Sequence, residues 1–92
     1  MNNWRKILSW DMSQRQPSVG DKVRVTASMA DLLELGINKW DAVLLKVRTC
    51  TITRIDELCI DITSDIREPG DSVVVDRSVP THNWQNYLEI ID

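Results

Sequence analysis

The fold is indicated first by the stretch Val19-Gly20-Asp21-Lys22-Val23-Arg24-Val25-Thr26. From Asp21 to Ala27, Val23 and Val25 alternate with polar residues, as in a strand with one buried face. A second stretch closes the chain: His82-Asn83-Trp84-Gln85-Asn86-Tyr87-Leu88-Glu89-Ile90-Ile91, an aromatic turn that runs straight into a strand. With three more strand-like runs between them, residues 19–92 predict a small, mainly β domain of five strands.

The segment after the first strand predicts a helical turn and then a long strand. Ser28 with Asp31 resembles a capping box, and Gly36 fits the left-handed position that ends a helix, so the turn is expected at residues 29–35. Residues 42–55 are rich in Val, Ile and Thr, and their alternation shifts by one residue near Arg48-Thr49. We interpret this run as one bent strand with a β-bulge at that point.

The third and fourth strands are predicted at residues 58–63 and 72–77, around the turn Glu68-Pro69-Gly70-Asp71. Pro80 is expected to end the fourth strand, and Thr81 to cap the turn that follows. If the second and third strands place their apolar residues on one face, two cross-strand pairs are expected: Ile52 with Ile60 and Cys50 with Ile62. This register buries Cys50 and exposes Cys59, so a disulfide between them is not expected.

Residues 1–18 form a separate head and linker in this interpretation. Asn3 is a candidate cap for a short helix in which Trp4, Ile7 and Leu8 share one side. Such a helix is too short to persist alone. We therefore expect it to dock on the β domain, on a partner or on a second copy, where these three residues form a second contact or a dimer seam.

Composition excludes several classes of function. The chain has 92 residues and no apolar run of bilayer length, and its N-terminal apolar pair is too short for a signal peptide, so a cytoplasmic location without membrane contact is expected. His82 is the only histidine and has no placed partner, and the glycines form no phosphate-binding loop. The sequence therefore predicts no enzyme, no metal site and no cofactor.

Charge and aromatic residues indicate a binding surface instead. The strand assignments place four cations outward on neighbouring strands: Lys22, Arg24, Lys46 and Arg48. An acidic patch is expected on another wall, from Asp61, Asp65, Glu68, Asp71 and Asp76. Trp40 and Trp84 are predicted in two loops that border one groove, with Tyr87 beside them. Trp is favoured at binding hot spots because it combines a large apolar face with a polar edge.

This pattern resembles the SH3-like small barrels. Residues 20–25 and 87–91 look like the first and last strands of ferredoxin-docking barrels, such as the family found in photosystem I and the variable chain of ferredoxin-thioredoxin reductase. KOW-type barrels open similarly. The resemblance implies a five-stranded barrel, here with a short N-terminal helix and a helical turn after the first strand. It also implies binding through loops and one barrel wall.

The predicted function is that of a non-enzymatic protein-protein interaction module, a small regulator, inhibitor or adaptor that docks on a protein partner. An RNA- or DNA-binding small barrel is the alternative, because such barrels combine a basic groove with stacking aromatics. A net charge of -3 and a pI near 5.0 favour the protein partner. A homodimer is a further expectation.

Overall fold

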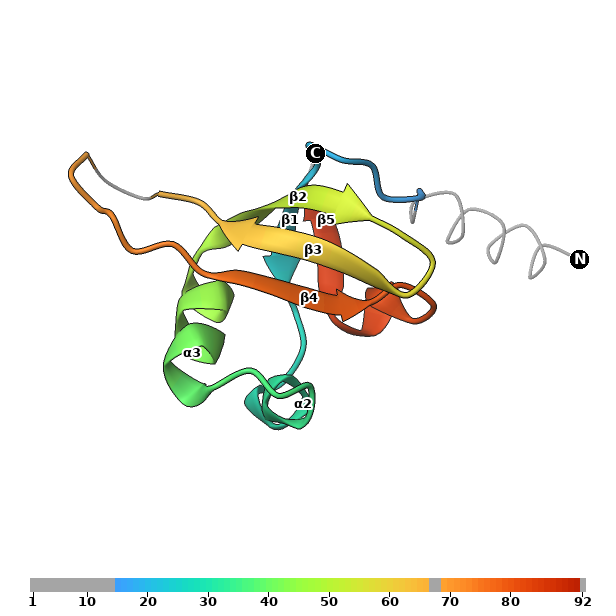
Figure 1. Ribbon diagram of the computed structural model, residues 1–92, viewed down its shortest axis with the longest axis horizontal. Helices are drawn as coiled ribbons and strands as arrows, with labels where there is room; N and C mark the ends of the chain where they lie inside the picture. Colours follow the sequence, from blue (N-terminus) through green and yellow to red (C-terminus); the bar gives the residue numbers. More distant parts are fainter. Residues whose placement is uncertain (1–14, 67–68, 92) are drawn as a thin grey trace, which may run out of the picture.

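A computed structural model describes residues 15–66 and 69–91, which form a five-stranded antiparallel sheet with two helices (Figure 1). The strand order is β4-β3-β2-β1-β5. The strands are β1 (Lys22–Val25), β2 (Thr49–Ile55), β3 (Cys59–Ser64), β4 (Asp76–Pro80) and β5 (Leu88–Ile91). The helices are α2 (Met29–Glu34) and α3 (Lys39–Val47), and a short 3-10 turn, η1 (Trp84–Asn86), precedes β5. The mainly β class and the number of strands are as predicted.

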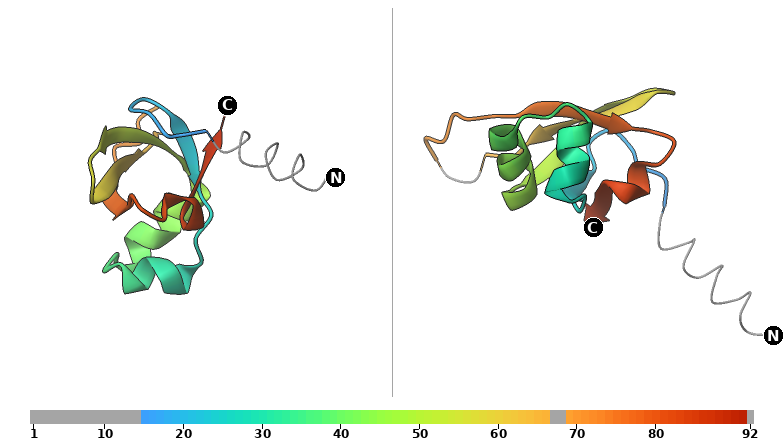
Figure 2. Two further views of the ribbon diagram at one scale, coloured as in Figure 1. Left: turned by 90° about the vertical axis from the view of Figure 1, so that its right-hand side faces the viewer. Right: turned by 90° about the horizontal axis from the view of Figure 1, so that it is seen from below.

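The sheet is strongly curved, and both helices lie on the same side of it (Figure 2). It is not closed into a barrel, because β4 and β5 are its two edges and do not pair with each other among the described residues. The predicted barrel closure is therefore not observed.

Strand β1 joins the last strand to the rest of the sheet, since it pairs with both β2 and β5. Its alternation is as predicted: Val23 and Val25 are buried, whereas Lys22 and Arg24 point outward. The strand is shorter than residues 21–27. The hydrophobic core takes residues from all five strands, both helices and the segments between them. It contains Val23, Val25, Ala27, Leu32, Ile37, Ala42, Leu45, Cys50, Ile52, Ile60, Ile62, Val75, Val79, Trp84 and Leu88.

Helix α2 confirms the local signals in the sequence. The Ser28 hydroxyl accepts a hydrogen bond from the Asp31 amide at 3.1 Å, as an N-cap should. Gly36 has a φ of +90°, a conformation that glycine adopts without strain. Leu32 turns into the core, which anchors the helix to the sheet.

Helix α3 contradicts the prediction of a strand over residues 42–55. The Asn38 side chain caps it by accepting from the Asp41 amide at 2.9 Å. Its buried residues are Ala42 and Leu45, three positions apart as on one side of a helix. Residues 42–47 are apolar at both strand and helix spacings, so alternation alone was misleading. The shift near Arg48-Thr49 is the junction between α3 and β2, and no bulge lies there.

The bulge lies further along β2, between Ile52 and Arg54, so the predicted register is also wrong. Ile52 pairs with Ile62, and Cys50 pairs with Ser64. Both pairs keep the same face, so the predicted burial survives the slip. Cys50 is buried, Cys59 is partly exposed, and both thiols are free.

The fourth strand begins later than predicted, at Asp76. Pro80 is its last residue, which an edge strand tolerates because an edge amide needs no partner strand. Thr81 does not cap η1: its hydroxyl donates to the Asp56 carbonyl at 2.8 Å. In β5, Leu88 is buried and Ile90 packs against the core, as predicted.

Candidate functional site

The predicted basic surface is not assembled on one wall. Lys22 and Arg24 do point outward from β1, but both are paired with carboxylates. Lys22 Nζ lies 3.0 Å from Asp65 Oδ1, and Arg24 Nη1 lies 3.0 Å from Glu89 Oε1. Neither side chain therefore presents an uncompensated positive charge to a partner.

Lys46 and Arg48 are not on a strand wall at all. Lys46 belongs to α3 and donates from Nζ to the Ala27 carbonyl. Arg48 follows the helix, and its side chain is only 9% exposed. Its Nη2 lies 2.7 Å from Asp71 Oδ2, and its Nη1 donates to the Val73 carbonyl at 2.5 Å. Arg48 is thus a structural link between α3 and the loop that precedes β4.

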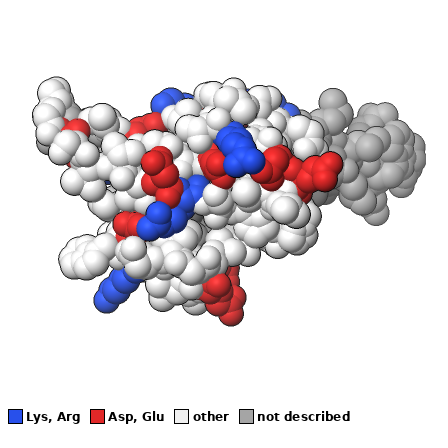
Figure 3. All heavy atoms as spheres, in the orientation of Figure 1, with Lys and Arg blue, Asp and Glu red and all other residues white. Residues whose placement is uncertain are grey.

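Three members of the predicted acidic patch, Asp61, Asp65 and Asp71, lie in ion pairs, and Figure 3 shows positive and negative side chains next to one another on the face that it presents. Burial alone would raise the pKa of Asp65, but hydrogen bonds from Thr51, Thr49 and Lys22 lower it below its usual value. Asp61 lies 3.6 Å from Arg54 Nη1. Glu68 lies outside the described residues.

The aromatic residues do not form the predicted groove. Trp84 is buried in the core, and Tyr87 is half-buried and packs against it. Trp40 lies on α3 with 80% of its surface exposed. The predicted head contacts Trp4, Ile7 and Leu8 lie outside the described residues.

A polar depression of about 400 Å³ lies across β2, β3 and β4. Its lining is mostly hydroxyl and charged groups: Thr53, Asp61, Ile62, Thr63, Asp76, Arg77 and Ser78. These groups bond mainly to each other. Thr63 donates to Asp76 at 2.5 Å and Ser78 donates to Asp61 at 2.5 Å, so both carboxylates of the depression are hydrogen-bonded within it.

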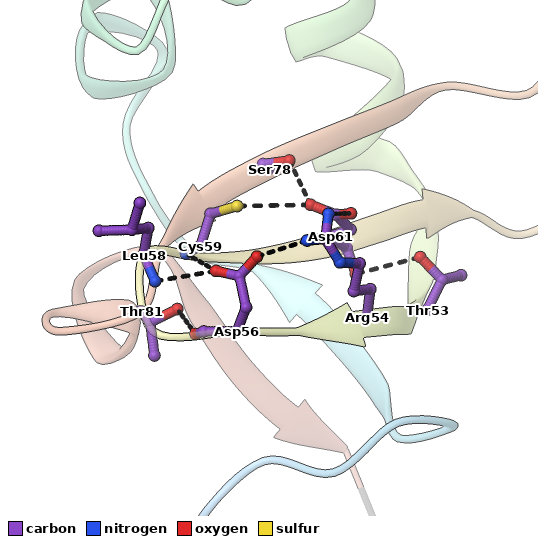
Figure 4. A network of polar contacts seen from close by, with 8 residues as sticks. All are labelled: Thr53, Arg54, Asp56, Leu58, Cys59, Asp61, Ser78 and Thr81. Atoms are coloured by element: carbon purple, nitrogen blue, oxygen red, sulfur yellow. Dashed lines mark hydrogen bonds and ion pairs between the residues drawn. The ribbon is translucent and has the colours of Figure 1, made fainter.

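The neighbouring hairpin is held by a polar network centred on two carboxylates (Figure 4). Asp56 Oδ1 accepts from the amides of Cys59 and Leu58, each at 2.8 Å, and these bonds lower the pKa of Asp56. Burial, followed by the charges of Asp56 and Asp61, raises the pKa of the Cys59 thiol. A raised pKa disfavours the reactive thiolate form of the Cys59 side chain. The network ties the turn between β2 and β3 to the end of β4.

Residues 15–66 and 69–91 contain no group of three His, Cys, Asp or Glu side chains placed to hold a metal ion. Cys50 is buried, and burial, together with the charge of Asp65, raises its pKa to about 11.

The outer side of α3 carries a row of exposed apolar residues. Trp40, Val43 and Val47 project from it at positions i, i+3 and i+7, which places them in one row along the helix. We call this row the Trp40 face. Their exposed fractions are 80%, 38% and 56%. The sequence signal that would have revealed this face is the helical spacing of the apolar residues in 39–47 behind the capping residue Asn38.

The loop before β4 lies next to the C-terminal end of α3. Arg48 fixes it there, because its side chain bonds to the Val73 carbonyl and to Asp71. Val73 and Val74 are both exposed there. Figure 1 shows this loop and α3 at the same end of the domain.

Comparisons with known proteins give no relative for this chain. No protein-family model matches it, and no match was found among curated proteins or solved structures. Within the described part of the chain, no helix combines the length and the apolar character that crossing a membrane requires.

Proposed function

We propose that this protein is a non-enzymatic docking module of SH3-like type, which binds another protein through the Trp40 face and regulates or adapts that partner. The observation that carries the proposal is the exposure of Trp40 on a capped helix that is packed firmly on its other side. An exposed Trp next to two valines offers the apolar anchor that binding hot spots use. The SH3-like assignment is supported by β1, which pairs with both β2 and the last strand.

Ion pairing argues against the nucleic-acid alternative. Binding to phosphates depends on cations that are available to replace counterions. Among the described residues, six cationic side chains are already bonded to carboxylates: Arg15, Lys22, Arg24, Arg48, Arg54 and Arg77.

The test uses a photoreactive amino acid at position 40 in the native host and, as the matched control, at position 58. Leu58 is also highly exposed, at 82%, but lies at the tip of the β2–β3 hairpin, away from α3. We expect position 40 to capture a protein that position 58 does not. Binding of that protein, once purified, is then measured by calorimetry.

Trp40→Ala should weaken binding about 30-fold or more, which corresponds to the loss of a hot spot of about 2 kcal/mol. Leu58→Ala should bind like the unaltered protein. Equal affinity of the captured protein for the Trp40→Ala variant would refute the docking face. Titration with labelled RNA and DNA at low salt is the companion measurement, and tight binding that falls steeply with salt would favour the nucleic-acid function instead.

A further inference from the structure

We propose that the Trp40 face also receives residues 1–14 of a second copy of this chain, so that copies associate head to tail. This inference rests on the proposed function, because it uses the same docking face and names what competes for it. Self-association would then cover the face until another protein displaces the second copy.

Helix α3 is apolar on two sides, and the described residues cover only one of them. Ala42 and Leu45 are fully buried against the sheet, whereas Trp40, Val43 and Val47 point away from it. A helix that is apolar on both sides is normally covered on both. The described residues cover only the inner side, so the outer row fits another apolar helix or segment.

The first 14 residues have the sequence of such an occupant. They precede the described part of the chain and carry Trp4, Ile7 and Leu8 at helical spacing. A helix of this length is marginal in water unless its apolar side is packed. Residues 4–8 and 40–44 also share the spacing Trp-x-x-(Ile/Val)-Leu, so both can offer a similar ridge to a facing helix.

Charge on the neighbouring helix complements the same segment. Residues 1–14 carry Arg5 and Lys6 against the single acidic residue Asp11, so the segment is weakly basic. Helix α2, which packs against α3, exposes Asp31 and Glu34, and neither forms an ion pair with another described residue. A basic segment docked on α3 would therefore have carboxylates available on the adjoining helix.

The position of Arg15 favours docking of residues 1–14 on a second copy rather than on the Trp40 face of the same chain. The described chain begins at Arg15, which is paired with Asp21 at 2.9 Å. The next turn is fixed by the Gly20 amide, which donates to the Ile52 carbonyl at 2.8 Å. Figure 1 shows this start of the chain at the opposite end of the domain from α3. A helix of fourteen residues would span about 21 Å and could reach a neighbouring copy without the chain turning back across the sheet.

The contact is heterologous, because the head of one copy meets the α3 of the next. Such contacts form rings when the rotation closes and open chains when it does not. An open chain leaves one uncovered Trp40 face at its end, which is where another protein can bind. Binding of that protein is therefore expected to shorten the assemblies.

The test measures the mass of the full chain in solution by light scattering, from about 1 μM to about 1 mM. We expect the mass of the unaltered protein to rise with concentration. Trp4→Ala, which lacks the head anchor, and Trp40→Ala, which lacks the receiving face, should each remain monomeric. An equimolar mixture of the two should give a dimer of twice the monomer mass, because the intact head of one variant meets the intact face of the other.

Three results would overturn the inference. They are a monomeric unaltered protein at every concentration, continued association of Trp4→Ala alone, and a mixture that stays monomeric. Leu58→Ala is the matched control and should associate like the unaltered protein, while circular dichroism checks that each variant is folded. If the unaltered protein is monomeric but Trp40→Ala still abolishes binding of the protein partner, only this inference is refuted. If copies associate head to tail but Trp40→Ala binds the protein partner as the unaltered protein does, only the proposed function is refuted.

Discussion

Replacing Leu45 and Val47 separately by alanine tests whether residues 39–47 are helical. Leu45 is fully buried, and truncating a buried leucine to alanine costs about 3 kcal/mol through lost contacts and the cavity left behind. Val47 is 56% exposed on the other side of α3, so its truncation should change the free energy of unfolding by only about 0.5 kcal/mol. In a strand, the two residues would share one face and have similar effects.

Urea unfolding followed by tryptophan fluorescence gives the free energies. A 92-residue domain has a stability of roughly 5 to 14 kcal/mol, so both variants should remain measurable. With a slope of about 1.5 kcal/mol per molar urea, Leu45→Ala should lower the midpoint by about 2 M and Val47→Ala by about 0.3 M or less. Equal losses in the two variants would place both side chains on one buried face and would refute the helix.

Three further predictions concern other parts of the molecule. Arg48→Met and Asp71→Asn should each destabilise the fold, and a double-mutant cycle by urea unfolding should give a coupling of about 2 kcal/mol, whereas additive effects would contradict the link. Because the pKa of Asp65 is lowered in the fold, its contribution to the free energy of unfolding is complete above the unfolded pKa near 3.8 and is lost as the pH falls through the folded pKa. Asp65→Asn should therefore reduce the loss of stability at acidic pH, and an unchanged loss would contradict the hydrogen bonds from Thr51, Thr49 and Lys22. The Cys50 thiol, buried and with its pKa raised to about 11, should react with a thiol reagent at pH 8 only as fast as the protein unfolds, and prompt reaction in Cys59→Ser would contradict its burial.

Short-range signals predicted the parts of the fold that depend on a few neighbouring residues. Ser28 and Gly36 bracket α2 because a cap and a left-handed turn are local properties of the backbone. The alternation of Val23 and Val25 identified β1 for the same reason. The burial of Cys50 was also predicted correctly, although its strand partner was not, because a slip of two residues preserves which face a side chain occupies.

Patterns that fit two structures were decided only by packing. Residues 42–47 satisfy both strand and helix spacing, and the helix prevails because it buries Ala42 and Leu45 together behind an Asn38 cap. This choice moved Lys46 and Arg48 off the predicted basic wall. The head contacts Trp4, Ile7 and Leu8 remain a prediction from the sequence.

The amino-acid sequence by itself determined a mainly β domain of five strands, the helical turn after the first strand, and a set of aromatic residues that had to be core or binding surface. Only the tertiary structure decided which aromatic residue serves which purpose. Trp84 fills the core and Trp40 is exposed, because the packing of α3 against the sheet turns one side of that helix outward. Charge followed the same rule: the sequence sets the number of cations, but only the fold brings Lys22 to Asp65 and Arg48 to Asp71. Electrostatic pairing depends on distances between residues far apart in the chain, and no local pattern encodes those distances.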